Sequence, residues 1–236
     1  MVVVVIVSIL AFLAIPSMST ARFDHVAYSD AGSIMMLLRQ ARMRAIARGG
    51  AELVAMTANG TSDRGTFGLW EAVTLNPNGG AGSARLPVPN CSAPTQWGTP
   101  VASYGAQAPI TVVASGMQGN NQQSVVFIDG VNLNTTAASV QTVEVTADIE
   151  TQLYYYQNSA NPAPVAFNQG FVCFTPLGRS YANVVGATSP IFDGFQPSLT
   201  VIEARVLRGV NNNVSSGQIR SVLLPPNGMA RLYSHT

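Results

Sequence analysis

The first residues of the chain form a hydrophobic segment that carries no charge. Met1–Ile15 contains a single polar residue, Ser8, and Pro16 separates it from the polar run Ser17–Thr20. As a helix, Val2–Ile15 spans about 21 Å, because each helical residue adds about 1.5 Å. A bilayer core is about 30 Å thick. The segment therefore predicts a membrane-associated helix that lacks roughly one to two turns at its N-terminal end.

The helical pattern continues beyond Pro16, although Ser29-Asp30 and Gly32-Ser33 are possible weak points in it. A stripe of apolar residues then recurs at the spacing of one helical face. Its members are Ile34, Leu37, Leu38, Ala41 and Ala45. Gly49-Gly50 is a stop signal. We expect a nearly continuous helix over residues 2–48, on the order of 70 Å long. No compact monomer buries such a rod, so its first half must lie in lipid or against copies of itself.

After Gly50 the sequence alternates short strand-like runs with turn residues, and it shows no second helix. The strand candidates are Ala51–Ala58, Thr66–Leu75, Ile110–Ala114, Ser124–Ile128, Val140–Val145, Leu153–Tyr156, Phe171–Thr175, Tyr181–Val185, Leu199–Leu207, Ile219–Leu224 and Met229–Leu232. The expected fold class is α+β, with a long and partly transmembrane N-terminal helix packed on an antiparallel β-sheet or sandwich head. Residues 1–16 would form the anchor or filament core, residues 17–49 the docked helix, and residues 50–236 the head.

Cysteine and histidine residues are too few for a recognisable metal site. The chain has two of each, namely Cys91, Cys173, His25 and His235, without zinc-ligand spacing. Beyond a membrane anchor the compartment is oxidising, where two cysteines usually form a bridge. The alternative is a pair of buried free thiols. Neither histidine lies near a serine or cysteine in a nucleophile motif. We therefore expect no cofactor, no metal and no enzymatic activity.

The hydrophobic run Met1–Pro16 resembles the start of a type IV pilin-like protein. In that class the run normally follows Gly-Phe-Thr-Leu-Ile-Glu-Leu, so we expect this prepilin motif to be missing from the N-terminus. Three further segments are similar to minor pilins and pseudopilins of the GspH/FimT (FimU) family. They are Leu37–Met56, Gly170–Asn183 and Val201–Tyr233.

The resemblance implies a structural protein that takes part in assembly of a type IV pilus or a type II secretion pseudopilus. It implies a single-pass bacterial inner-membrane protein with its head in the periplasm, and the N-terminal methylation of the class. Its partners would be other major or minor pilins or pseudopilins and inner-membrane lipid. The residues of the membrane and filament helix would be Val2, Val3, Val4, Val5, Ile6, Val7, Leu10, Leu13, Ile15 and Pro16.

Two other functions remain open from the sequence. Some FimT-like proteins bind DNA during uptake through a Gly-Arg-x-Arg-like element, but the corresponding Gly228-Met229-Ala230-Arg231 has one arginine of that element. The candidate nucleic-acid contacts are Arg205, Arg208, Arg220 and Arg231. The net charge of +1 gives no global attraction for nucleic acid. The remaining alternative is a membrane-anchored periplasmic domain that forms no filament.

Overall fold

A computed structural model describes residues 2–58, 64–75, 86–91, 122–134, 149–156, 163–184, 201–210, 214–215 and 218–235. Two of the predicted strands, Ile110–Ala114 and Val140–Val145, lie outside the described residues. For residue 2 and residues 4–20 the structure gives the backbone of the helix but not the side chains.

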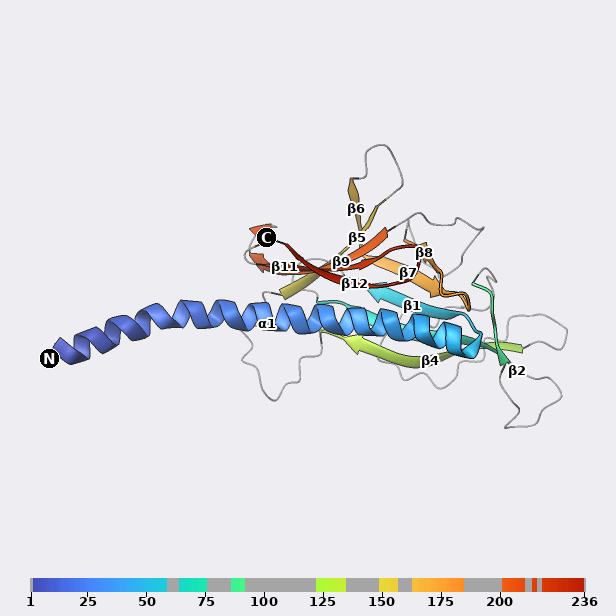
Figure 1. Cartoon of the computed structure of the whole chain (residues 1–236), viewed down its shortest axis with the longest axis horizontal. Coiled ribbons are helices and arrows are strands. Elements are labelled where there is room, and N and C mark those ends of the chain that lie inside the picture. Colours follow the sequence, from blue (N-terminus) through green and yellow to red (C-terminus); the bar gives the residue numbers. More distant parts are fainter. Residues whose placement is uncertain are drawn as a thin grey trace.

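The chain begins with the helix α1, which spans Val2–Arg48 in 47 residues. It crosses both predicted weak points without interruption and ends at Gly49, whose φ of 66° is a left-handed conformation that glycine adopts readily. Figure 1 shows that the C-terminal half of α1 lies along the strands, while its N-terminal part projects beyond them. The helix therefore has a docked half and a projecting half.

Two antiparallel sheets make up most of the described head. The first has the order β3-β2-β1-β7-β8, with β4 also paired to β2, and consists of β1 (Glu52–Thr57), β2 (Thr66–Leu75), β3 (Leu86–Pro87), β4 (Gln122–Asn132), β7 (Gln169–Phe174) and β8 (Ser180–Asn183). The second has the order β12-β11-β9-β5-β6, with β10 also paired to β9, and consists of β5 (Ile149–Tyr156), β6 (Pro164–Phe167), β9 (Val201–Val210), β10 (Val214–Ser215), β11 (Ile219–Leu224) and β12 (Arg231–His235).

One hydrophobic core joins α1 to both sheets. Alternate residues along a strand point to opposite faces, so Val54 and Met56 of β1 face the helix from the first sheet, and Leu153 of β5 faces it from the second. A smaller cluster lies on the far face of the first sheet, around Leu53 and Trp70. Burial of these apolar surfaces is the main favourable term that holds the head together.

These observations correct the predicted fold class. The described chain is mostly antiparallel strand in two sheets, and no helix in it combines the length and the apolar character that a bilayer crossing requires. The physical reason lies in the sequence of α1, where the hydrophobic run ends at Pro16 and is followed by the polar Ser17–Thr20 and then by Arg22 and Asp24. The partly transmembrane helix was therefore a wrong prediction. The predicted single-pass anchoring in the inner membrane, which depended on such a helix, is contradicted by the same finding.

Candidate functional site

The docked half of α1 is the best-defined feature of the described residues. Its predicted stripe is buried, with Ile34, Ala41 and Ala45 fully enclosed and Leu37 and Leu38 each 3% exposed. The same face continues towards the N-terminus of the helix. There it buries Phe23, Val26, Ala27 and Ala31. Because the docked half is held firmly, it fixes the direction in which the projecting half of α1 leaves the head.

A buried ion pair between Asp30 and Arg64 crosses this interface. Arg64 Nη2 lies 2.8 Å from Asp30 Oδ1 and 2.7 Å from Oδ2, and Arg64 Nε lies 2.9 Å from Oδ2. Thr151 of β5 donates its hydroxyl to Arg64 O at 2.6 Å, and Asn134 Oδ1 accepts from Arg64 N at 2.8 Å. Burial raises the pKa of Asp30, and the Arg64 guanidinium opposes that rise. The pair therefore links α1 to the beginning of β2, to the segment after β4 and to the second sheet.

Two glutamates and two arginines lie together under the last turns of α1. Glu52 of β1 and Glu71 of β2 are opposite each other in the sheet, and both are buried. Arg44 contacts Glu52 (Nε–Oε1, 3.3 Å) and Glu71 (Nη2–Oε2, 3.2 Å), while Arg48 Nε lies 2.7 Å from Glu71 Oε1. Glu71 thus holds both arginines, and Glu52 Oε2 finds no hydrogen-bond partner in the described part of the chain.

This arrangement makes Glu52 titrate far from its ordinary range. Burial, and then the negative charge of Glu71, raise the pKa of Glu52 to about 8, and Arg44 and Arg48 only partly oppose the shift. Since the pKa is higher in the folded state than the ordinary 4.5, the stabilisation from Glu52 is complete below about pH 4.5. It is lost as the pH rises through about 8.

Replacement of Glu52 by Gln is therefore expected to remove this pH dependence. The variant should exceed wild type in free energy of unfolding by about 1–3 kcal/mol at about pH 9, and the difference should shrink towards about pH 5. Glu71→Gln is the matched control, and it should destabilise at both values because Arg44 and Arg48 lose their shared carboxylate. Urea unfolding at the two pH values measures this. Parallel pH profiles for wild type and Glu52→Gln would contradict the assignment.

Two tight turns, one from each sheet, meet at the docked half of α1. The turn after β7 places Gly178 at a φ of 74°, and the turn after β11 places Gly228 at 75°. Arg42 Nε donates to Gly178 O at 3.1 Å, and a Cβ added to Gly228 would collide with that same oxygen. Ser180 donates its backbone N–H to Pro226 O at 3.2 Å. We call this meeting of helix and turns the turn junction.

The four arginines proposed for nucleic-acid contact are divided between two faces of the second sheet. Arg208 lies over the ring of Phe23 at 4.0 Å, and Arg220 lies over the ring of Tyr28 at 5.6 Å, so both face the helix. Arg205 lies on the opposite face, where it contacts Glu203 at 2.9 Å and the ring of Tyr154 at 4.3 Å.

Arg231 is exposed at the start of β12, opposite Leu223 of β11. The sequence held a signal for the division of the other arginines, because Arg205 and Arg208 are separated by an odd number of strand positions and must point to opposite faces. These arginines do not form a single basic stripe of the kind that a nucleic-acid backbone requires.

Arg205 belongs to a polar group that the sequence did not reveal. Glu203 accepts hydrogen bonds from Tyr156 and from Arg205, and Arg205 Nη2 also donates to Tyr156 Oη at 2.9 Å. Burial acts to raise the pKa of Glu203, but the hydrogen bonds from Arg205 and Tyr156 outweigh it and lower the pKa. Burial and the Glu203 contact raise the pKa of Tyr156. Since Arg205 is occupied by Glu203, it is not an available cation.

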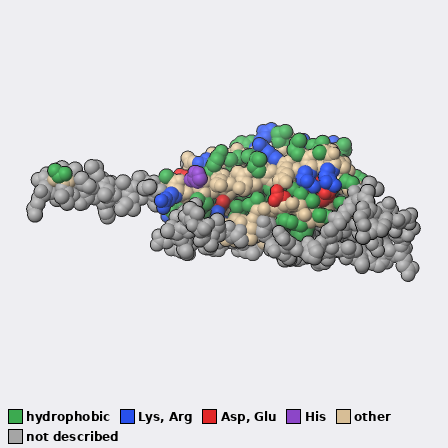
Figure 2. Space-filling model, turned by 90° about the horizontal axis from the view of Figure 1, so that it is seen from below, with side chains coloured by type: hydrophobic (Ala, Val, Ile, Leu, Met, Phe, Trp, Pro, Cys, Tyr) green, Lys and Arg blue, Asp and Glu red, His purple; other side chains and the backbone are tan. Residues whose placement is uncertain are grey.

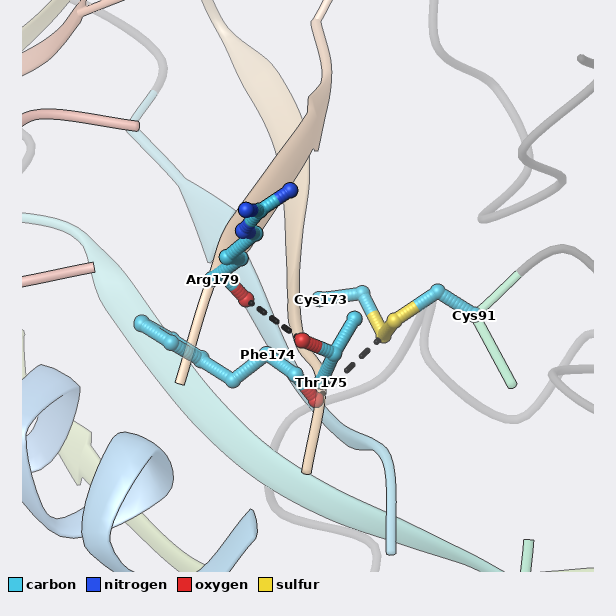
Figure 3. Close-up of a disulfide and its surroundings, with 5 residues drawn as sticks. All are labelled: Cys91, Cys173, Phe174, Thr175 and Arg179. Carbon is cyan, nitrogen blue, oxygen red and sulfur yellow. Dashed lines mark hydrogen bonds between the residues drawn. A yellow bond between two sulfur atoms is a disulfide. The ribbon is translucent and has the colours of Figure 1, made fainter. Parts of the chain in front are cut away.

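A disulfide joins Cys91 to Cys173, with the two Cα atoms 6.0 Å apart. Figure 3 shows the bridge beside the end of β7, where Thr175 donates its hydroxyl to Arg179 O at 3.4 Å. Cys173 is fully buried and Cys91 is 6% exposed, so both belong to the smaller cluster on the far face of the first sheet. The bridge ties the segment after β3 to the middle of the sheet.

The projecting half of α1 holds the residues predicted for the membrane and filament helix. Val3 is described and is 73% exposed. The other side chains of that set lie outside the described residues, namely those of Val2, Val4, Val5, Ile6, Val7, Leu10, Leu13, Ile15 and Pro16. The helical backbone continues through Pro16.

Metal ligands do not gather in the described ranges, where no group of three or more His, Cys, Asp or Glu residues is placed to hold an ion. Comparison with known proteins finds no match to this chain among family models, curated proteins or solved structures.

Proposed function

We propose that this chain is a structural subunit of the minor pilin or pseudopilin kind, which joins a filament or its tip complex through α1. The observation that carries the proposal is the projecting half of the helix. It extends beyond the head in Figure 1, its residues Val2–Ile15 carry no charge, and Val3 is 73% exposed.

The physical reason is the cost of leaving such a surface in water. Each buried CH₂ group contributes about 0.8 kcal/mol, so a charge-free helix gains stability when helices of neighbouring subunits cover it. The docked half supports this role because its buried stripe and the Asp30–Arg64 pair hold the helix at a fixed angle to the head. A rigid connection lets helix packing set the position of each head.

The proposal is tested with the variant Val3→Asp, since Val3 is exposed and its replacement leaves the core of the head untouched. Purified wild-type chain is expected to form ordered rods or oligomers of defined size when a nonionic detergent is diluted. The Val3→Asp chain should remain in smaller species, because an unpaired carboxylate between packed helices costs several kcal/mol. Sedimentation velocity and negative-stain electron microscopy measure the two outcomes.

Ser29→Asp is the matched control, because Ser29 is an exposed residue on the docked half of the same helix. This variant should assemble as wild type does. Amorphous aggregates from wild type, or equal assembly of wild type and Val3→Asp, would refute the proposal.

A further inference from the structure

The turn junction carries a group of exposed hydrophobic side chains. Leu177, in the turn after β7, is 83% exposed, and Met229, beside the turn after β11, is 44% exposed. Met43 and Ile46 of α1 are 59% and 44% exposed. Ile46 lies against the turn after β7, since a Cβ added to Gly178 would lie 3.0 Å from Ile46 Cδ1. Met43 is one helical turn from Ile46 on α1, and Met229 directly follows Gly228, which lies against Gly178 O. We call Met43, Ile46, Leu177 and Met229 the junction patch.

Arginines lie beside the junction patch. Arg39 Nε donates to Ala230 O at 3.2 Å, and Arg42 Nε donates to Gly178 O at 3.1 Å. Arg179 is exposed and directly follows Gly178. Arg231 is exposed as well, but it pairs with Leu223 on the face of the second sheet that points away from α1. The ion pairs found among the described residues involve Arg44, Arg48, Arg64 and Arg205, so none of them supplies a carboxylate to the arginines of the patch.

Exposed apolar groups beside arginines that form no ion pair within the described residues are unusual for a surface that meets only water. Single exposed hydrophobic residues are ordinary, but a contiguous group bordered by polar residues marks a contact site. Arginine and methionine are both enriched at protein interfaces. On the face that Figure 2 shows, arginine side chains lie among hydrophobic ones on the head.

We propose that the junction patch binds a segment of another protein that presents an apolar side chain flanked by carboxylates. The apolar side chain would contact Leu177 and the two methionines, whose flexible side chains adapt to different shapes. Arg39 and Arg42 each use Nε for a backbone carbonyl at the turns, and the terminal nitrogens of a guanidinium can donate to carboxylate oxygens. This inference goes beyond the proposed function and stands whether or not α1 assembles.

Nucleic acid fits the patch less well. A phosphate backbone is recognised by several spaced cations, and its affinity comes from neutralised charges. The four side chains of the junction patch are apolar and would gain nothing from a phosphate. A carboxylate-bearing peptide with an apolar anchor satisfies both kinds of group at once.

The test is a selection of random peptides displayed on phage, with the full chain in nonionic detergent as the bait. Peptides rich in Asp or Glu next to Leu, Met or Phe are expected. Their affinity should fall about tenfold or more with Leu177→Ser, and also with Arg39→Gln. Raising the salt concentration should weaken peptide binding as well. Val165→Ser is the control variant, because Val165 lies on β6 and is 40% exposed. It should leave the peptide affinity unchanged.

Three outcomes would overturn the inference. One is enrichment of neutral or basic peptides, or of none. Another is binding that is equal for wild type and Leu177→Ser, with circular dichroism showing both chains folded; Met229→Ser gives a second reading if Leu177→Ser does not fold. The last is tighter binding of a short DNA duplex than of any selected peptide, with the DNA binding abolished by Arg39→Gln. None of these readings depends on helix assembly, so they are distinguishable from a failure of the Val3→Asp experiment.

Discussion

Replacement of Asp30 by Ala is expected to lower the free energy of unfolding by about 3–5 kcal/mol, because it leaves the guanidinium of Arg64 buried without a counter-charge. Asp30 is 5% exposed and Arg64 is 8% exposed, so water does not replace the lost carboxylate without opening the interface. Arg64 also lies at the meeting point of β2 and β5. The loss should therefore loosen the contact of α1 with both sheets together.

A double replacement separates the cost of a broken pair from the value of the pair itself. Burial raises the pKa of Asp30 against the opposing effect of Arg64, which indicates that desolvation uses up most of the attraction. Asp30→Leu with Arg64→Met should accordingly recover most of the stability that Asp30→Ala loses. The pair then specifies where the helix docks more than it adds net stability.

Urea unfolding followed by circular dichroism measures these free energies. Asp24→Ala is the control, since Asp24 lies on the same helix, is half-exposed, and makes no ion pair among the described residues. Its effect should stay within about 0.5 kcal/mol. A loss below about 1 kcal/mol for Asp30→Ala would contradict the role assigned to the pair.

Local patterns in the sequence predict the elements of the fold well where the apolar period is clear. The helical stripe from Ile34 to Ala45 and the stop at Gly49-Gly50 locate the docked half of α1. Strand-like runs between turn residues locate β2 and β11 at the observed bounds. These features depend on neighbours within a few positions, which is the range over which sequence periodicity carries information.

Contacts between distant parts of the chain carry no such local signal. Asp30 reads as a weak point in a helix, and only its position against Arg64, 34 residues away, explains why a buried helix face contains a carboxylate. The same holds for Glu52 and Glu71, which lie opposite each other only because of the register between β1 and β2. The membrane prediction failed for a different reason. The apolar run by itself is too short to cross a bilayer.

Loss of the Cys91–Cys173 bridge is expected to lower the free energy of unfolding by about 4–5 kcal/mol. The two cysteines are 82 positions apart, and a closed loop of that length removes roughly this much chain entropy from the unfolded state. The double variant Cys91→Ala with Cys173→Ala is the proper comparison. Serine at position 173 would add a buried hydroxyl, because Cys173 is fully enclosed.

Denaturant unfolding with and without a thiol reductant measures the effect. Reductant should lower the wild-type midpoint to that of the double alanine variant, which should itself be insensitive to reductant. Because the bridge acts mainly on the unfolded chain, hydrogen exchange by local opening in the second sheet, remote from the cysteines, should be unchanged, whereas exchange that requires global unfolding should accelerate. A wild-type midpoint that does not respond to reductant, under conditions where thiol titration shows the bridge open, would show that the bridge does not restrain the unfolded chain.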